Sequence, residues 1–418
     1  MINIKVMIRY KHRLIENKLA ELFQYYPVVA VLGARQVGKS TLVENLYSGK
    51  IRTTVFDPVV DIGNARQDPD FFLQNIKAPA FFDEVQYAPE LLNAIKRKVD
   101  QEKKNGMYIL SGSQNLSVLR DISESLAGRV AILNLWSMSY SEVHEKTGGG
   151  FLEQWLLDPE KDFLSEDDAV DTNRSVFDAI WKGGYPKISE LPDALIPAYW
   201  QSYMQTYIER DVRKVANIGS LQTFGRFVGL LGALTAQEVN SNQLGRELGV
   251  ARATALSWAQ TAESTFQWIS IPAFSRNPVK KISGKNKGYF TDTGLICNLQ
   301  KISSPEVIAS HPLQGALFET FVVMEIVKLI QKLPIQPNLY HFRSHSGAEV
   351  DLILELNGRL YPVEIKSKSN PYRKDVRGFQ AFKDCFPKEN IQKGLVVCAV
   401  PSLQYIKKDV LAVPWWYL

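Results

Sequence analysis

The residues with the clearest chemical purpose form the segment Gly-Ala-Arg-Gln-Val-Gly-Lys-Ser, which begins at Gly33. The segment matches the phosphate-binding pattern Gly-x-x-x-x-Gly-Lys-Ser/Thr, and it lies between an apolar run and a helix-like stretch. Its glycines let backbone N–H groups turn toward phosphate oxygens, Lys39 can reach the β- and γ-phosphates, and the Ser40 hydroxyl can ligate Mg²⁺. We therefore predict a nucleotide-binding loop made of Gly33, Ala34, Arg35, Gln36, Val37, Gly38, Lys39, Ser40 and Thr41.

A second chemical feature is the short apolar run that begins at Ala80 and ends in the carboxylates Asp83 and Glu84. Many strands end in a solvated carboxylate, so the run alone indicates little. After a phosphate-binding loop, it predicts a parallel strand beside the strand that carries the loop. Asp83 would then hold Mg²⁺ through water, and Glu84 would polarise the water that attacks the phosphate.

Three later residues offer further groups for the same reaction. Ser113 and Gln114 follow a third predicted strand, where a polar side chain can touch the γ-phosphate or the attacking water. A plain turn after the strand explains them equally well. Arg129 could stabilise the charged transition state, either in its own subunit or in a neighbouring copy of a homo-oligomer, or it is a surface cation.

A separate group of candidate residues lies near the C-terminus. Asp351 stands in the middle of one predicted strand, an Asn-Gly turn follows, and Glu364 and Lys366 share one face of the next strand. An Asp followed by Glu-x-Lys on the paired strand matches the PD-(D/E)xK nuclease core, in which carboxylates bind Mg²⁺ and the lysine orients water. Glu319, in a helical pattern upstream, could add a carboxylate. The alternative is a hairpin with salt-bridged charges.

The composition of the 418 residues is that of a soluble globular protein, with 45% hydrophobic and 22% charged residues. No apolar run approaches the roughly 18 residues of a membrane span, and the first residues lack a signal-peptide core. The three cysteines are scattered without metal-ligand or disulfide spacing. These features predict a cytoplasmic protein without a membrane partner. The excess of basic residues after position 200 permits contact with nucleic acid.

The order of predicted elements divides the chain into four parts. Residues 1–146 alternate strands and helices, as in a parallel α/β sheet domain, and residues 147–218 form an acidic linker and helical connection. Residues 219–303 show a helix-turn-helix rhythm around Gly249, typical of a winged helix that either reads DNA or serves as an interaction surface. Residues 304–418 carry the nuclease-like group.

The chain as a whole resembles a prokaryotic family of AAA-type P-loop ATPases that carry a C-terminal region called DUF4143. The resemblance implies an AAA-like ATPase domain, a winged-helix middle, a restriction-endonuclease-like C-terminal α/β fold, and ATP with Mg²⁺ as the ligands. The matching motifs run over nearly the full length: Gly33 to Thr41, Phe82 to Gln86, Gly112 to Gln114, Ser125 to Arg129, Gly183 to Pro186, Tyr207 to Val212, Phe290 to Leu295, Gly347 to Asp351, Glu364 to Lys366, and Pro414 to Trp416.

These observations support one function and two rivals. The first is an ATPase that couples its nucleotide state to the C-terminal module. The second is an ATP-gated, metal-dependent nuclease that uses Asp351, Glu364 and Lys366. The third is a nucleotide-controlled switch that binds DNA or protein without significant turnover. The intact Glu84 favours hydrolysis over the pure switch, and the intact C-terminal group keeps the nuclease open.

Overall fold

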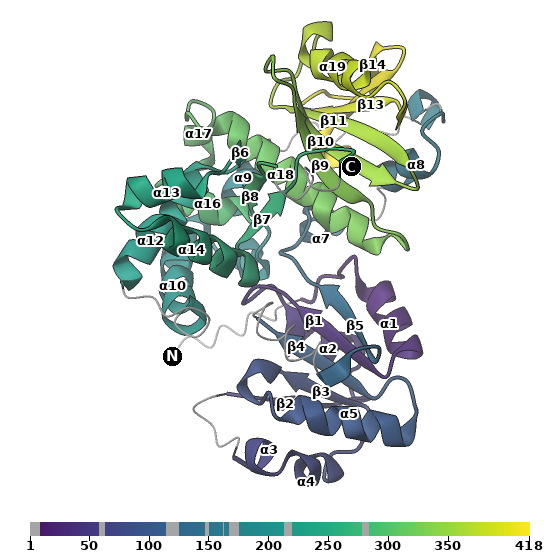
Figure 1. The fold of residues 1–418 in the computed structure, drawn as a ribbon, viewed down its shortest axis with the longest axis vertical. Coiled ribbons are helices and arrows are strands. Elements are labelled where there is room, and N and C mark those ends of the chain that lie inside the picture. Colours follow the sequence, from purple (N-terminus) through teal and green to yellow (C-terminus); the bar gives the residue numbers. More distant parts are fainter. Residues whose placement is uncertain are drawn as a thin grey trace.

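The computed structural model describes residues 9–57, 63–113, 125–146, 150–161, 163–166, 175–212, 220–277 and 284–418. Gln114 and the acidic residues 167–171 lie outside these ranges. An N-terminal sheet with its helices, a helical middle and a C-terminal sheet follow one another along the chain (Figure 1). Among the described helices, none has the length and apolar character needed to cross a bilayer.

The N-terminal part is built on a five-stranded parallel sheet with the order β2-β3-β4-β1-β5. Strand β4 lies between β1 and β3, so the prediction that Asp83 lies on a strand beside β1 is wrong. Apolarity marks buried strands but says nothing about their order across a sheet. The strands are β1 (Val28–Leu32), β2 (Arg52–Val55), β3 (Ala80–Asp83), β4 (Tyr108–Gly112) and β5 (Val130–Asn134).

Helices accompany this sheet because a chain that forms parallel strands must cross back to the same end of the sheet before each new strand, usually through a helix. Helix α1 buries Leu19 and Phe23, two of the residues that give its sequence an apolar side. Helix α5 buries five of its residues in the same way, with charged residues on the other side. The helices are α1 (Glu16–Tyr25), α2 (Lys39–Leu46), α3 (Gly63–Gln67), α4 (Pro69–Gln74) and α5 (Leu91–Glu102).

The middle part consists mainly of helices and a small antiparallel sheet with the order β6-β8-β7. Helices α13 and α14 are joined at Gly249, as the helix-turn-helix pattern predicts. The elements are α9 (Val176–Lys182), α10 (Ile196–Thr206), α12 (Leu221–Ala233), β6 (Gln237–Glu238), α13 (Ser241–Leu248), α14 (Arg252–Ser264), β7 (Trp268–Ile271), β8 (Lys287–Phe290), α16 (Thr293–Leu299) and α17 (Pro305–Ile308).

The C-terminal part is a mixed sheet with the order β14-β15-β13-β11-β10-β9, and β12 pairs with β11. Two hydrophobic clusters meet it, one that includes helix α18 and one that includes helix α19. The elements are α18 (Gln314–Leu329), β9 (Asn338–Arg343), β10 (Glu349–Leu356), β11 (Arg359–Lys366), α19 (Arg377–Cys385), β12 (Asn390–Ile391), β13 (Gly394–Cys398), β14 (Gln404–Lys407) and β15 (Val410–Pro414).

The stretch predicted as a linker is divided between the other parts of the molecule. Helix α7 (Tyr140–Val143) follows the N-terminal sheet and ends before this stretch. Helix α8 (Phe151–Leu157), within the stretch, packs on the C-terminal sheet. The Trp155 ring meets Tyr361 with centroids 5.1 Å apart, and the Tyr361 hydroxyl donates to the carbonyl of Leu156 at 2.7 Å. Helix α9 instead packs against α16 and α17 of the middle part. Spacing and charge alone did not reveal this division.

We predict that Trp155→Ala lowers the free energy of unfolding of the C-terminal part by about 3–5 kcal/mol, because it removes a buried ring that is only 1% exposed. Leu157→Ala on the same helix is the matched control, since that side chain is 67% exposed. Urea unfolding followed by tryptophan fluorescence and circular dichroism measures both variants. Equal stability of the two variants would show that α8 does not hold the C-terminal sheet.

Candidate functional site

The loop between β1 and α2 depends on two glycines. Gly38 caps α2 with φ at +97°, a backbone conformation that residues with a Cβ rarely adopt. A Cβ on Gly33 would lie 2.1 Å from the carbonyl oxygen of Leu135, so this position has no room for a side chain. The strand, loop and helix follow in the order that the sequence predicts. Backbone N–H groups at the start of α2 are thereby available for an anion.

Lys39, Ser40 and Asp83 meet at the carboxyl edge of the sheet. Lys39 is buried, and its Nζ donates to the carbonyl oxygens of Gly33 at 3.0 Å and Ala34 at 2.9 Å. The Ser40 hydroxyl donates to Asp83 Oδ2 at 2.6 Å. The other carboxylate oxygen of Asp83 accepts a hydrogen bond from Ser111 of β4. Although β4 separates β1 from β3, the parallel strands bring both polar ends to one place.

Glu84 follows Asp83 in a left-handed backbone conformation, with φ at +57°. Its N–H donates to Ser111 Oγ at 3.0 Å, and its carboxylate accepts from the side chain of Gln86. Burial alone would raise the pKa of Glu84, but the charge of Lys39 and the hydrogen bond from Gln86 outweigh it, so the pKa lies below the ordinary value. Glu84 is therefore ionised at neutral pH.

Ser113 lies behind Glu84. Its hydroxyl accepts a hydrogen bond from Gln86 Nε2 at 3.1 Å, and the same amide group donates to Glu84. Ser113 is buried and is not among the residues that line the cavity over the loop. Ser113 is therefore connected to Glu84 through the side-chain amide of Gln86.

A cavity of about 310 Å³ lies over the loop and is closed partly by residues that the sequence motifs did not single out. Lys187 and Glu190 are two of them, and Pro186 lies beside them, with its Cγ 3.8 Å from where a Cβ on Gly38 would be. Tyr199 donates its hydroxyl to Gln36 of the loop at 2.8 Å. The motif from Gly183 to Pro186 was the one available hint. The lining consists of Arg9, Tyr10, Lys11, Arg13, Gln36, Gly38, Lys39, Ser40, Thr41, Glu84, Met138, Pro186, Lys187, Ser189 and Glu190.

Arg13 connects the loop to the end of β5. Its guanidinium is buried, forms an ion pair with Glu142 at 3.0 Å, and donates to the carbonyl oxygens of Val37 and Trp136 at 2.8 Å each. A buried charge-assisted network of this kind stabilises one geometry, because losing any partner leaves a buried charge unpaired. The N-terminal segment therefore helps to set the shape of the phosphate-binding loop.

Arg129 does not reach the cavity of its own chain. Its carbonyl oxygen accepts from Val28 N at 3.3 Å, so Arg129 lies at the amino end of β1, and the loop follows the carboxyl end. Five residues of strand separate the two ends, which is about 16 Å. The guanidinium forms an exposed ion pair with Asp100 at 2.5 Å. The predicted role within one subunit is therefore wrong, and a role in a neighbouring copy stays a prediction.

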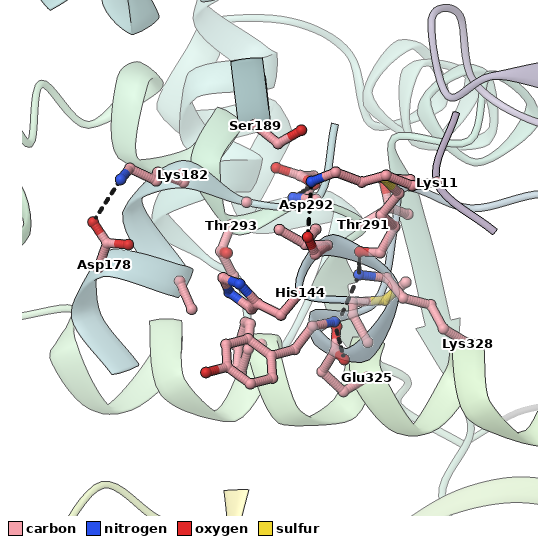
Figure 2. Close-up of a pocket in the computed structure, with 18 residues that line it drawn as sticks. Lys11, His144, Asp178, Lys182, Ser189, Thr291, Asp292, Thr293, Glu325 and Lys328 are labelled. Carbon is pink, nitrogen blue, oxygen red and sulfur yellow. Dashed lines mark hydrogen bonds and ion pairs between the residues drawn. The ribbon is translucent and has the colours of Figure 1, made fainter. Parts of the chain in front are cut away.

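A second cavity of about 210 Å³ lies where the three parts meet (Figure 2). Asp292, at the start of α16, accepts from Gly184 N at 2.9 Å and Gly294 N at 3.0 Å. Burial raises its pKa. Lys328 of α18 donates to the carbonyl of Met138 at 2.9 Å and pairs with Glu325 at 3.0 Å. The polar groups here join the segment over the loop, the middle part and α18.

The C-terminal group predicted from the sequence is gathered in one place. Lys366 Nζ lies 2.5 Å from Glu364 Oε1 and 3.6 Å from Asp351 Oδ2, so one ammonium group pairs with both carboxylates. Asp351 Oδ2 also accepts from Ile365 N at 2.8 Å. Burial and the charge of Asp351 raise the pKa of Glu364 well above its usual range, against the influence of Lys366.

Lys287 of β8 is the member of this group that sequence reasoning missed. Its Nζ lies 2.6 Å from Glu319, 2.7 Å from Glu349 and 3.5 Å from Asp351. Tyr289 also donates to Glu319, at 2.7 Å. Burial and the charge of Asp351 raise the pKa of Glu319 to about 7. No motif pointed to Lys287, since one lysine among several in a basic stretch carries no specific signal in a single sequence.

The match of this C-terminal group to a metal site is incomplete. Its carboxylates are the oxygen ligands that Mg²⁺ prefers. However, the described residues contain no cluster of three or more His, Cys, Asp or Glu side chains arranged to hold a metal ion. Lys287 stands among the carboxylates instead. The arrangement present in the structure does not fit a divalent cation.

Comparison with known families covers most of the chain. A family model described as an AAA domain matches residues 25–144. Two models described as domains of unknown function, DUF8612 and DUF4143, match residues 173–306 and 314–418. The first and third match the two regions that the sequence resemblance named.

Individual proteins that resemble this chain share less than a third of its residues. Two uncharacterized proteins, Rv2008c of Mycobacterium tuberculosis and Mb2031c of Mycobacterium bovis, are each 27% identical over 346 residues, which is 82% of this chain and 71% of theirs. A Walker-type ATPase of Pyrococcus abyssi is 16% identical with a TM-score of 0.46, over 70% of this chain and 99% of its own. The RuvB Holliday junction branch migration motor of Thermotoga maritima is 17% identical with a TM-score of 0.30, over 63% and 89%.

The match at residues 25–144 includes the phosphate-binding loop and both acidic residues at the end of β3. The match at residues 314–418 includes Asp351, Glu364 and Lys366. The chain therefore carries a region that matches an AAA domain, followed by a C-terminal region that matches DUF4143.

Proposed function

We propose that the protein binds ATP between its N-terminal and middle parts and hydrolyses it. The observation that carries this proposal is the hydrogen bond from Ser40 to Asp83 beside Lys39, in a cavity of about 310 Å³. A hydroxyl and a carboxylate in contact form a donor pair suited to Mg²⁺, with Ser40 as a direct ligand and Asp83 acting through water. When bound, Mg²⁺ would neutralise phosphate charge.

The residues of the chain have distinct roles in this proposal. Lys39 would exchange its contacts with the carbonyls of Gly33 and Ala34 for the β- and γ-phosphates. The ionised Glu84 would accept a hydrogen bond from the attacking water and orient it. Ser113 would keep Glu84 in place through Gln86. An arginine from a neighbouring copy, Arg129, would stabilise the transition state if the protein forms a homo-oligomer.

Coupling to the rest of the molecule would begin at the segment over the loop. Pro186 packs over Gly38, and two residues earlier Gly184 donates its N–H to Asp292. Asp292 follows closely after β8, whose first residue is Lys287 at the C-terminal group. A shift of this segment when ATP binds would therefore be transmitted to β8 through a short chain of contacts.

We predict that Glu84→Gln keeps ATP affinity but slows hydrolysis by roughly 10²-fold or more, because the amide cannot activate water. Lys39→Ala is the comparison variant, and it should lose binding itself, since the charge on the β- and γ-phosphates is removed. Binding of a fluorescent ATP analogue and release of phosphate measure the two effects separately.

Three outcomes of these measurements distinguish the proposals. Wild-type affinity in Lys39→Ala would contradict nucleotide binding at the loop. Unchanged phosphate release in Glu84→Gln would move the base to another residue. Tight binding with negligible turnover in the unmodified protein would favour the nucleotide-controlled switch over the ATPase.

A second prediction concerns coupling. Adding ATP and Mg²⁺ should change amide hydrogen exchange in residues 184–190 and in β8 of the unmodified protein. The same addition should leave exchange in Lys39→Ala unchanged, because that variant would not hold the nucleotide. A change confined to the phosphate-binding loop would show that the nucleotide acts locally and does not reach the C-terminal part.

We further propose that helices α12 to α14 and the sheet β6-β8-β7 form a winged-helix module. Support comes from the two helices joined at Gly249 and from the antiparallel strands that pair beside them. Arg252 starts helix α14 and is the one basic residue of that helix. Because DNA recognition usually needs several cations on the helix that enters the groove, an interaction or structural role fits this helix better. The basic excess after residue 200 still permits nucleic acid as a partner.

The second candidate function is a metal-dependent nuclease in the C-terminal part, of restriction-endonuclease-like fold. The observation that favours it is the contact of Lys366 with both Asp351 and Glu364. Asp351→Asn should then abolish any cleavage of DNA or RNA in Mg²⁺ or Mn²⁺ while ATP hydrolysis stays within twofold of the unmodified protein, because the sites lie in separate parts. Absence of cleavage by the unmodified protein, with and without ATP, would leave a binding module as the better interpretation.

A further inference from the structure

The C-terminal carboxylates already have a cation among them, and it comes from another part of the chain. Lys287 begins β8 of the middle sheet, yet its side chain lies among carboxylates from α18 and β10. It is 3% exposed and pairs with Glu319, Glu349 and Asp351 at 2.6, 2.7 and 3.5 Å. Lys287 is therefore fixed by three carboxylates in a buried site, whereas the partners of a surface ion pair are exposed and mobile.

The group also keeps an oxygen atom without a partner. Glu364 is 5% exposed, and its Oε2 atom is buried with no hydrogen-bond donor among the described residues. Its other oxygen pairs with Lys366. Since a buried acceptor is normally satisfied, the arrangement has one acceptor more than its donors supply. A cation ligated by oxygen atoms would satisfy such an acceptor.

The balance of charges at the C-terminal group also favours a bound cation. Four carboxylates, Glu319, Glu349, Asp351 and Glu364, face two ammonium groups, Lys287 and Lys366. Removing Lys287 would leave the surplus of negative charge close together and partly shielded from water, which is costly unless the carboxylates take up protons or another cation enters. A divalent cation would restore the balance that Lys287 provides.

We propose that Lys287 is the resident counter-ion of the C-terminal carboxylates and occupies the position that a divalent cation would take. The C-terminal group therefore excludes divalent cations while β8 is in place and accepts one when Lys287 withdraws. This inference rests on the contacts of Lys287 and on the unpaired oxygen of Glu364, and it does not depend on ATP hydrolysis. The position of Lys287 explains why the residues of the nuclease-like pattern lie together and yet do not form a metal site.

The test is a Mn²⁺ titration of the full chain without nucleotide, followed by electron paramagnetic resonance of free Mn²⁺. Lys287→Met keeps a long side chain but removes the charge, and it should gain one Mn²⁺ site that the unmodified protein lacks. The gained site should bind at least tenfold more weakly in Lys287→Met combined with Glu364→Gln. Lys285→Met is the matched control and should gain no site, because Lys285 is exposed and pairs only at 3.6 Å with Glu238.

Thermal unfolding supplies a second readout if Lys287→Met is poorly folded. Mn²⁺ should raise the Tm of Lys287→Met by several degrees more than it raises the Tm of the unmodified protein, and Glu364→Gln should remove the difference. Either of two results would overturn the proposal. One is Mn²⁺ binding by the unmodified protein that Glu364→Gln abolishes. The other is a Lys287→Met variant that neither binds Mn²⁺ nor is stabilised by it.

Discussion

The buried carboxylate of Asp292 is the contact that joins the segment over the phosphate-binding loop to helix α16. It caps α16 by accepting from Gly294 N, and it accepts from Gly184 N, whose segment covers the phosphate-binding loop. There is little room around it, since a Cβ on Gly183 would lie 2.1 Å from Asp292 Oδ1. Such close backbone packing can shift only as a unit, so the segment over the loop and α16 are constrained to move together.

Arg13 places a similar constraint on the other side of the loop. Its guanidinium joins Val37, Trp136 and Glu142, so the loop, the end of β5 and α7 share one cation. The phosphate-binding loop is thus held on one side by a buried charge network and on the other by a tightly packed segment. Because both sides of the loop are fixed in this way, nucleotide binding would displace whole segments of the chain rather than single side chains.

How far the sequence predicts this protein differs between its parts. The loop from Gly33 to Thr41 was predictable because phosphate binding requires particular residue types at a fixed spacing. The gathering of Asp351, Glu364 and Lys366 followed from the two-residue period of adjacent strands. Strand order did not follow, because β3 and β4 are equally apolar and nothing local decides which lies beside β1. Arg129 was misplaced for the same reason, since its position depends on which end of the sheet it occupies.

Contacts between parts were the least predictable. Lys287 and Pro186 act on sites more than thirty residues away in the chain, and no local pattern shows which site either residue contacts.

Helix α8 has a practical consequence for anyone who works with pieces of this chain. It precedes the whole middle part in sequence, yet it covers Tyr361 of the C-terminal sheet through Trp155 and reaches Tyr417 through Phe151. A fragment cut at the start of the DUF4143 match, residue 314, would lack this helix and expose aromatic side chains that are buried in the intact chain. Such a surface promotes self-association. A soluble C-terminal fragment would have to carry residues 150–157 as a fused segment.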